Sequence, residues 1–448
     1  MDTGPTDTGA MVALIERWWP EAPGFAGEVR GVLSSLAPLL SAQPELASEG
    51  MLERSCQPER VLMFQVPWRA DDGSVHVNRG YRVQFNSALG PYKGGLRFHS
   101  EVGLDLFLSL AFEQVLKNSL TGLRLGGAKG GSDFEPRGRS DAEVARFCAS
   151  FMTELHHHIG ADVDVPAGDI GVGGREIGYL FGAYKRLVGR FEPGALTGKD
   201  PAWGGSLVRR EATGYGLVYF VREMLRQRGE DLAGKRAVVS GAGKVAIYAM
   251  EKLVDLGARV LACSDRGGAL VDPDGVDVAT VKRIKELERG SLQRYVEARP
   301  RARYLPGANV WAQPCEVALP CATQNELDVR DARRLIVNGV QTVAEGANLP
   351  CSPDAVAAFR AAGVGFGPGK AANAGGVATS GLEMQQNAAQ QAWTFEDVDA
   401  RLQAIMVDIH RRCSEASERV GRPGDLVAGA NVAGFERVAR AMLDLGVV

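Results

Sequence analysis

A chain of 448 residues exceeds the usual size of one domain, so we expect two domains with a cleft between them. Its residues are 45% hydrophobic and 23% charged, which is typical of a soluble folded protein. A net charge of -3 gives no electrostatic basis for binding nucleic acid or an acidic membrane surface. No apolar run reaches the roughly 18 residues of a membrane span, so we expect no membrane contact.

The chain contains seven cysteines and no CxxC pair. An odd number without such a pair indicates reduced thiols rather than a disulfide framework. The first residues, Met1–Pro5, lack the basic and apolar regions of a signal peptide. We therefore expect a cytoplasmic protein.

The first 120 residues are predicted to change from helix to strand and back to helix. Residues 11–60 place apolar and charged residues at helical spacing, and residues 61–85 contain two β-rich runs around a turn at Asp71–Gly73. Residues 104–120 predict a strong helix. Gln114 and Lys117 lie three residues apart on this helix, so both side chains fall on one face.

The most informative motif is GGAKGG at residues 126–131, in which one lysine lies between two glycine doublets. Glycines without side chains allow backbone and substrate to approach the amine of Lys129 closely. A buried ammonium loses hydration, so its pKa falls and it can transfer protons near neutral pH. The alternative interpretation is a phosphate-binding turn or an irregular loop.

Residues 192–216 are rich in glycine and turn residues, and we place the domain hinge there. Beyond the hinge, strands and helices alternate, which predicts a parallel sheet with crossover helices. The helical segment 395–448 is expected to run back across the hinge. We therefore expect residues 1–200, joined by the helix 425–448, to form one domain, and residues 201–424 to form the other.

A dinucleotide-binding motif follows the first strand of the second half. The residues GAGKVA at 241–246 match G-x-G-x-x-A between a predicted strand and a predicted helix. Gly241 permits the tight turn, Gly243 lets the backbone approach a pyrophosphate, and Ala246 allows close packing of helix on strand. The N-terminus of the helix then offers free N–H groups to the phosphates. The alternative is a fold of this type that binds another ligand or none.

Two residues at the end of the next strand bear on the choice of dinucleotide. Asp265 alone favours NAD, because a carboxylate pairs with the ribose 2′-hydroxyl and repels a 2′-phosphate. Arg266 beside it offers a bidentate fork for that phosphate. We favour NADP and keep NAD open.

Three lysines and one aspartate before the hinge form the second candidate site: Lys93, Lys117, Lys129 and Asp169. Together the lysines could neutralise a doubly negative substrate and leave one amine for chemistry. Taken singly, a helical lysine is usually solvated and an aspartate in GDIG is usually a turn residue. Their occurrence together, before a dinucleotide fold, favours a site.

Seven segments of the chain resemble the hexameric glutamate dehydrogenases of bacteria and lower eukaryotes, from about residue 50 to the C-terminus. They are GPYKGGLRFH (90–99), EQVLKNSL (113–120), GGAKGGSDF (126–134), DVPAGDIGVGGRE (164–176), EATGYG (211–216), LPCATQNEL (319–327) and PGKAANAGGVATSGLEM (368–384). The resemblance implies an α/β substrate-binding and oligomerisation domain, a Rossmann-like domain and a homohexamer. It implies reversible oxidative deamination of L-glutamate to 2-oxoglutarate and ammonia, with hydride transfer to NADP, in ammonium assimilation.

The family's functional residues match positions of this sequence. By resemblance, Lys93 and Ser380 hold the γ-carboxylate, while Gln114 and Lys117 hold the α-carboxylate near the Gly168 backbone. Lys129 polarises the 2-oxo group, and Asp169 moves protons to and from ammonia. The residues expected at the cofactor are Thr213, Gly241, Gly243, Lys244, Asp265, Arg266, Arg137, Asn348 and Asn373.

The sequence departs from the family pattern at two positions of the cofactor site. Lys244 stands where the family usually has Asn, and Arg266 stands where NADP-using members usually have Ser. Arg137 matches a basic residue that contacts the 2′-phosphate, which strengthens the expectation of NADP. Lys285 and Arg289 are further candidates for that contact.

Two other motifs invite a functional interpretation that we do not favour. The side chains of His156–His158 point about 100° apart on a helix and cannot converge on one ion, so we expect no metal. Cys321 has no evident histidine partner and is expected to be a small buried residue rather than a nucleophile.

Two alternative functions remain at this stage. One is a leucine- or phenylalanine-type amino acid dehydrogenase, in which an apolar substrate would leave the Lys93 ammonium unpaired. The other is a nucleotide-sensing subunit without activity, against which the presence of both Lys129 and Asp169 argues.

Overall fold

The computed structural model describes residues 8–447, so the Met1–Pro5 segment discussed above lies outside the described residues. The chain divides into two compact units. Unit 1 comprises the chain up to Leu207 together with Val377–Val398 and the residues from Asn431 onward, and unit 2 comprises Val208–Gly376 and Asp399–Ala430. Residues 377–398 thus group with unit 1, whereas the ranges drawn from the sequence placed them in the second domain.

The N-terminal part of unit 1 is helical, as predicted. Its helices are α1 (Thr8–Trp18), α2 (Pro23–Ala42) and α3 (Met51–Ser55). Pro23 occupies the first turn of α2, where a missing N–H group costs nothing.

A five-stranded sheet carries the substrate motifs of unit 1. Its strands are β1 (Arg60–Arg69), β2 (Val75–Asn86), β3 (Tyr92–Phe98), β4 (Gly127–Ser132) and β5 (Asp164–Gly168). They are ordered β1-β2-β4-β3-β5, with an antiparallel hairpin of β1 and β2 and parallel pairs of β3 with β4 and β5. The predicted hairpin around residues 71–73 is therefore confirmed.

The GGAKGG motif is a strand, β4, rather than a turn or a loop. A Cβ on Gly131 would lie 1.8 Å from the carbonyl oxygen of Arg97 on β3, and one on Gly127 would lie 2.6 Å from the backbone nitrogen of Val115 on the helix α4 (Leu104–Leu120). The glycines therefore allow β4 to lie against a strand and a helix more closely than side chains would permit. A turn or an irregular loop was the alternative interpretation of this motif, because glycine is usually a turn residue.

The remaining helices of unit 1 include α5 (Asp141–Leu155), α6 (Gly174–Val188), most of α14 (Gly375–Ala389) and most of α16 (Leu426–Leu445). The core between the sheet and α5 is aromatic, with the rings of Phe134 and Phe147 stacked at 3.8 Å.

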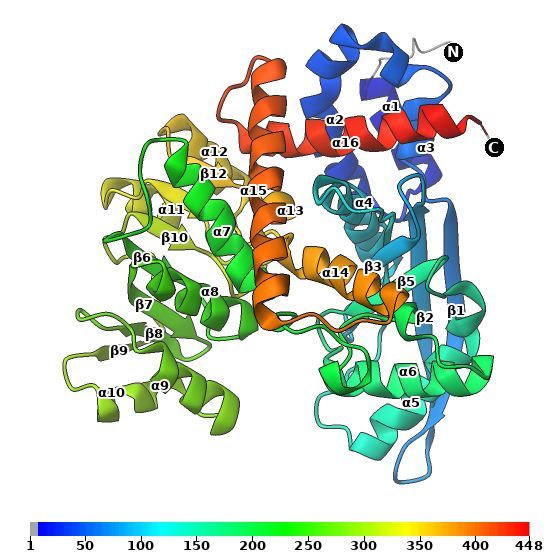
Figure 1. Cartoon of the computed structure of the whole chain (residues 1–448), viewed down its shortest axis with the longest axis horizontal. Helices are drawn as coiled ribbons and strands as arrows, with labels where there is room; N and C mark the ends of the chain where they lie inside the picture. Colours follow the sequence, from blue (N-terminus) through cyan, green and yellow to red (C-terminus); the bar gives the residue numbers. More distant parts are fainter. Residues whose placement is uncertain (1–7, 448) are drawn as a thin grey trace. The chain divides into compact units, whose positions relative to one another are not determined.

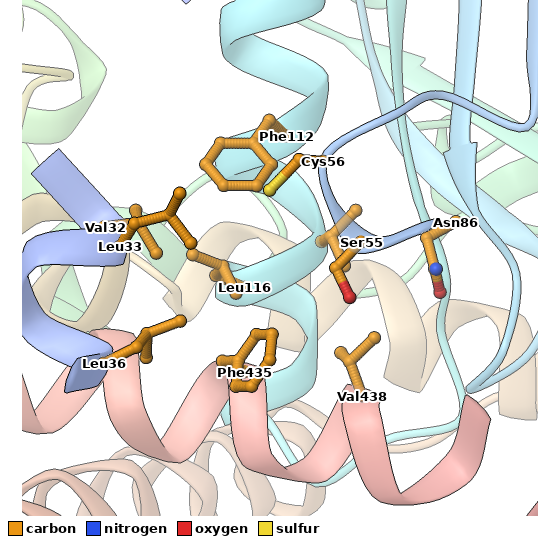
Figure 2. A pocket seen from close by; sticks show the side chains of 11 residues that line it. Val32, Leu33, Leu36, Ser55, Cys56, Asn86, Phe112, Leu116, Phe435 and Val438 are labelled. Carbon is orange, nitrogen blue, oxygen red and sulfur yellow. The ribbon is translucent and has the colours of Figure 1, made fainter. Parts of the chain in front are cut away.

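The helix α16 lies beside the N-terminal helix α2 (Figure 1). Asn431 donates to the Ser35 hydroxyl on α2 at 3.1 Å, and the Arg437 guanidinium donates to the Ser119 carbonyl at the end of α4 at 2.6 Å. A small apolar cavity is lined by residues of these three helices, with Phe112, Leu116 and Phe435 among them (Figure 2). The part of α16 from Asn431 onward therefore packs against α2 and α4 within unit 1.

Unit 2 contains a seven-stranded sheet in the order β12-β11-β10-β6-β7-β8-β9. Its strands are β6 (Arg236–Val239), β7 (Arg259–Asp265), β8 (Gly268–Val271), β9 (Arg303–Pro306), β10 (Val317–Leu319), β11 (Thr342–Ala344) and β12 (Gly365–Gly367). The five strands from β12 to β7 are parallel, and β8 and β9 pair antiparallel at one edge. This confirms the α/β fold class.

Parallel neighbours in the sheet of unit 2 are connected by α8 (Lys244–Asp255), α11 (Val329–Val337) and α12 (Pro353–Ala361). The other helices of unit 2 are α7 (Ala212–Arg226), α9 (Val278–Lys282), α10 (Tyr295–Ala298), α13 (Gly369–Ala372) and most of α15 (Phe395–Arg419). Across residues 8–447, no helix combines the length and the apolar character needed to cross a bilayer.

Candidate active site

Lys129 and Asp169 meet in the sheet of unit 1, although they are forty residues apart in the chain. Lys129 lies on β4 and Asp169 directly follows β5, with β3 between the two strands. The Lys129 ammonium lies 3.0 Å from Asp169 Oδ2, and both side chains are largely buried. A Cβ on Gly95 of β3 would lie 2.9 Å from the Asp169 side chain and 3.4 Å from Lys129 Nζ, so this glycine provides the space in which the pair forms.

Arg97 is a third member of this cluster and was not among the residues predicted from the sequence. Its Nε donates to Asp169 Oδ2 at 3.0 Å, and its side chain is also largely buried. The sequence contained one indication of its role. Lys93, Gly95 and Arg97 are spaced two residues apart on one strand, so their side chains are on the same face. An arginine in a strand is otherwise indistinguishable from a solvated surface residue.

The two cations determine the protonation of the cluster. Burial acts to raise the pKa of Asp169, but Lys129 and Arg97 outweigh it and lower that pKa to about 2. Burial lowers the pKa of Lys129, and the positive charge of Arg97 adds to this effect, while Asp169 opposes it. The carboxylate is therefore ionised near neutral pH, next to an amine whose pKa is depressed.

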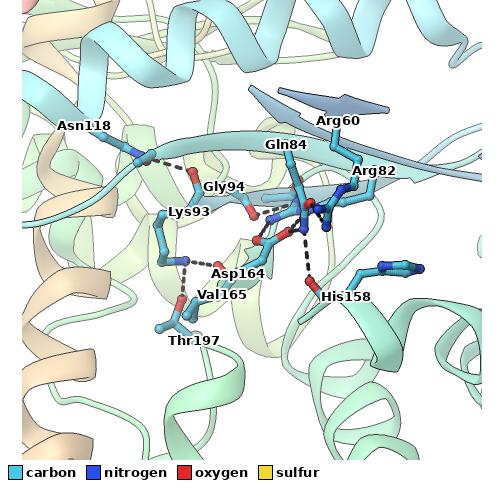
Figure 3. Close-up of polar contacts among 12 residues, drawn as sticks. Arg60, Arg82, Gln84, Lys93, Gly94, Asn118, His158, Asp164, Val165 and Thr197 are labelled. Atoms are coloured by element: carbon cyan, nitrogen blue, oxygen red, sulfur yellow. Dashed lines mark hydrogen bonds and ion pairs between the residues drawn. The ribbon is translucent and has the colours of Figure 1, made fainter. Parts of the chain in front are cut away.

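Lys93 lies on β3 with almost no exposure to solvent, at 1%. Its ammonium donates to the Val165 carbonyl on β5 at 3.0 Å and to the Thr197 hydroxyl at 2.8 Å (Figure 3). Thr197 was not expected from the sequence, because it lies in the glycine-rich segment that was interpreted only as a hinge. The Val165 and Thr197 oxygens therefore fix the position of the Lys93 ammonium inside unit 1.

A buried ion pair between Arg82 and Asp164 lies next to Lys93 and contacts the backbone there (Figure 3). Arg82 on β2 donates from Nε to Asp164 at 2.8 Å and from Nη1 to the Gly94 carbonyl at 3.1 Å, and both charged side chains are fully buried. Asp164 precedes Val165 in the chain, and Gly94 follows Lys93. The pair therefore fixes the two strands between which the Lys93 ammonium is held.

Gln114 and Lys117 lie on the helix α4, which was predicted over residues 104–120. Gln114 is buried and donates to the Asn118 side chain at 2.7 Å, while Asn118 donates to the Lys93 carbonyl at 3.0 Å. Lys117 is partly exposed on the same helix. The remaining two predicted substrate residues also lie in unit 1, with Gly168 at the end of β5 and Ser380 buried on α14.

The dinucleotide motif of unit 2 has the expected strand–turn–helix geometry. Gly241 follows β6 with φ of +86°, a conformation that side-chain-bearing residues rarely adopt. Gly243 is the N-cap residue of α8 and offers no side-chain acceptor to the first N–H groups of the helix. A Cβ added at Gly243 would meet no atom within 4 Å. Lys244 is the exposed first residue of α8. Open space in front of a helix N-terminus fits a pyrophosphate.

The carboxylate of Asp265 is already engaged within unit 2. It accepts hydrogen bonds from the Tyr304 hydroxyl at 2.8 Å, the Leu292 N–H at 2.9 Å and the Lys285 ammonium at 3.2 Å. Burial acts to raise its pKa, but these donors outweigh it and the pKa is lowered. Arg266 is exposed beside it. The arrangement neutralises the residue that would repel a 2′-phosphate and leaves a guanidinium accessible.

Asn373 carries a polar atom that suits a ligand. Its amide nitrogen donates to the Ala347 carbonyl at 3.0 Å and to Asn348 at 3.3 Å, whereas its buried Oδ1 has no partner among the described residues. A buried unpaired acceptor is costly unless another group donates to it. Thr213 lies on α7 of unit 2, and Arg137 lies exposed in unit 1.

The other two motifs take ordinary structural positions. His156–His158 form a single 3₁₀ turn, and within residues 8–447 no three His, Cys, Asp or Glu side chains are grouped so that they could hold a metal. Cys321 is buried, and burial raises the pKa of its thiol well above the usual value. The expectation of a small buried residue is confirmed, and a reactive thiolate is disfavoured.

Two family models match the chain. The model described as Glutamate/Leucine/Phenylalanine/Valine dehydrogenase matches residues 204–446, and that of the Glu/Leu/Phe/Val dehydrogenase dimerisation domain matches residues 58–186. The fold and the lysine-lined sheet are thus those of an amino acid oxidoreductase, and the chain belongs to the Glu/Leu/Phe/Val dehydrogenase family.

Within this family, the individual relatives reported below are glutamate dehydrogenases. The chain is 52% identical to the NADP-specific glutamate dehydrogenase of Helicobacter pylori, over 98% of its own length and 99% of the relative's. It is also 52% identical to the NADP-specific glutamate dehydrogenase of Escherichia coli, over 97% of both chains. The structure of Plasmodium falciparum glutamate dehydrogenase matches with a TM-score of 0.96 at 47% identity, covering 98% of this chain and 95% of that one. The resemblance inferred from the motifs is therefore confirmed.

Proposed function

We propose that this protein is an NADP-dependent glutamate dehydrogenase, which interconverts L-glutamate and 2-oxoglutarate plus ammonia. The observation that carries the proposal is the buried sheet cluster, in which Lys129 contacts Asp169 while Lys93 lies buried nearby on the adjoining strand. A buried ammonium beside this pair suits a substrate with a carboxylate at its distal end. An apolar amino acid has no distal carboxylate to offer to that ammonium.

The residues of unit 1 divide the work on the substrate. Lys93 and Ser380 bind the γ-carboxylate, and Gln114, Lys117 and the Gly168 backbone bind the α-carboxylate. Lys129 holds the 2-oxo group and stabilises negative charge on its oxygen, because the amine lies in a buried site where such charge is poorly solvated. Asp169, ionised beside two cations, accepts a proton from the attacking ammonia and returns it in the reverse direction.

The residues of unit 2 bind the cofactor. NADP, when bound, accepts the hydride from the substrate Cα. The backbone at Gly241, Gly243 and the start of α8 holds the pyrophosphate, while Thr213, Asn348 and Asn373 hold the nicotinamide end. Lys244, Arg266 and Arg137 supply positive charge for the phosphates, and Asp265 is held away from the 2′-phosphate by its own partners. NAD remains a weaker second cofactor in this proposal.

The working form of the enzyme is a homohexamer. β1 lies at the edge of the unit 1 sheet, and Met63, Val75 and Val77 expose apolar side chains on its hairpin. An exposed strand edge with apolar side chains favours pairing with a second copy. We place the enzyme in the cytoplasm, where its seven free cysteines stay reduced, and assign it to ammonium assimilation.

A coupled set of assays tests the proposal. Loss of NADPH absorbance is measured with 2-oxoglutarate and ammonium, and again with the 2-oxo acids of leucine and phenylalanine. We expect turnover with 2-oxoglutarate at least about a hundredfold more efficient than with the apolar acids. Replacing NADPH by NADH should lower kcat/KM. Equal efficiency with an apolar 2-oxo acid would contradict the substrate, and higher efficiency with NADH would contradict the cofactor.

A further inference from the structure

Glu383 and Lys199 form an ion pair that the chemistry above does not use. Both side chains are fully buried, and Lys199 Nζ lies 2.7 Å from Glu383 Oε1. Burial costs each ion hydration, which mutual attraction repays only when additional hydrogen bonds complete the geometry. A buried ion pair is therefore weak evidence for stability, and its other contacts indicate what it positions.

The other contacts of the pair hold the backbone around Thr197. The Gly198 N–H donates to Glu383 Oε2 at 3.0 Å, and the Lys199 ammonium donates to the Leu196 carbonyl. These two bonds fix the residues before and after Thr197. The Thr197 side chain is therefore placed by a carboxylate almost two hundred residues further along the chain.

The same carboxylate fixes α14, the helix that bears Ser380. Glu383 lies three residues after Ser380, so the two side chains project from one face of the helix. In the next turn, Gln386 donates to the Ser206 hydroxyl at 2.8 Å, and Asn387 donates to a backbone carbonyl of the same loop at 2.7 Å. A row of polar contacts thus joins α14 to the loop of residues 196–206.

We propose that Glu383, acting with Lys199, is a positioning residue that sets the specificity for the distal carboxylate of the substrate. Through one carboxylate it holds Thr197, which accepts from Lys93 at 2.8 Å, and the helix turn that presents Ser380. The inference rests on the proposed function, because it assigns these three residues to the γ-carboxylate. Neither Glu383 nor Lys199 touches the substrate in this account.

The chemistry of the pair explains why a carboxylate is needed there. One carboxylate can accept from the Gly198 N–H and the Lys199 ammonium at once, whereas an amide offers one acceptor oxygen and no charge. Glu383→Gln therefore leaves a buried ammonium without its anion. The loop should then shift to solvate that charge, and Thr197 moves with it.

The test compares Glu383→Gln with Glu192→Gln in the intact enzyme. Glu192 is a matched control, because it also accepts a backbone N–H and side-chain donors in unit 1, from Ala161, Tyr184 and Arg190. We expect Glu383→Gln to raise KM for 2-oxoglutarate about tenfold, with kcat within about threefold and KM for NADPH unchanged. The ratio of kcat/KM for glutamate to that for norvaline, which carries a methyl group in place of the carboxylate, should fall about tenfold. In Glu192→Gln, KM for 2-oxoglutarate and the ratio of kcat/KM for glutamate to that for norvaline should stay near those of the parent enzyme.

A second variant keeps the test valid if the single variant folds poorly. Lys199→Met with Glu383→Met removes both charges together, which avoids an unpaired buried ion. We expect the melting temperature of this double variant to be close to that of the parent enzyme. The variant should still lose the preference for glutamate over norvaline, because the Gly198 N–H has lost its acceptor. A folded double variant that keeps the parent's preference for glutamate overturns the inference. An equal fall in kcat/KM for glutamate and for norvaline in Glu383→Gln also overturns it. A parent enzyme that does not turn over glutamate overturns the proposed function and this inference with it.

Discussion

Glycine serves opposite purposes in the two units of this protein. In unit 1, a Cβ on Gly131 would lie 1.8 Å from a carbonyl oxygen of β3, and one on Gly94 would lie 1.6 Å from a carbonyl oxygen of β4. In unit 2, a Cβ on Gly243 would meet nothing within 4 Å. The first two glycines make room for the protein's own backbone, and the third leaves room for a ligand. A glycine-rich motif by itself therefore does not identify a phosphate site.

The charged groups of the two units differ in the same way. Lys93, Lys129 and Asp169 are buried or nearly so and already have partners, so their positions are fixed before a substrate arrives. Lys244 and Arg266 are exposed at the ends of secondary structure elements. Prearranged buried charge suits the stabilisation of a reacting group, while exposed charge adds a weaker, salt-dependent attraction for phosphates.

The comparison of glycines predicts the largest effect. Gly131→Ala should abolish folding or cost more than about 3 kcal/mol, because the new Cβ overlaps a backbone oxygen and the φ of +146° is one that side-chain-bearing residues rarely adopt. Gly243→Ala should change stability by less than about 1 kcal/mol and weaken NADPH binding about tenfold. Thermal unfolding and NADPH titration measure the two quantities. A Gly131→Ala enzyme with unchanged stability would contradict the account of β4.

The next largest effect concerns the buried amine. Lys129→Ala should reduce kcat by more than about a thousandfold, because it removes the cation that stabilises charge on the substrate oxygen. Circular dichroism should show an intact fold. Lys185→Ala, an exposed lysine on α6, is the control and should retain full activity. Near-normal turnover by Lys129→Ala would refute its catalytic assignment.

A smaller effect is expected in specificity. Lys93→Leu should lower kcat/KM for glutamate by about a hundredfold or more and move the preference towards apolar amino acids, because the charged partner of the γ-carboxylate is replaced by an apolar surface. Rates with glutamate and norleucine measure the shift. If the variant still strongly preferred glutamate, the γ-carboxylate would have to bind elsewhere.

The smallest effect is a displacement of the pH profile. Arg97→Gln removes a positive charge that lowers the pKa of Lys129 and of Asp169, so both pKa values should rise in the variant. With its pKa raised, Lys129 loses its proton only at a higher pH. The limb of the kcat/KM profile that reports this amine should move to higher pH in Arg97→Gln, measured in buffers of constant ionic strength. A limb at unchanged or lower pH would exclude Arg97 from the electrostatics of the site.

Much of the chain could be predicted because its signals are local. The helix of residues 104–120, the hairpin around residues 71–73 and the strand–turn–helix at residues 236–255 each follow from a short periodic pattern or a turn motif. The strand formed by most of GGAKGG could not be predicted, because strand formation by glycine depends on neighbours that become adjacent only in the sheet. Residues 377–398 likewise group with unit 1 through contacts that no composition change marks in the sequence.

By itself, the sequence determined the chemical types of the site: a glycine-flanked lysine, two further lysines, an aspartate and a dinucleotide loop, each recognisable within a few residues. Only the tertiary structure decided which side chains hold them in place. Arg97 contacts Asp169 across 72 residues, Lys93 contacts Thr197 across 104, and Lys199 contacts Glu383 across 184. Local spacing carries no information about such pairs, because their distance is set by how strands and helices pack rather than by their separation along the chain.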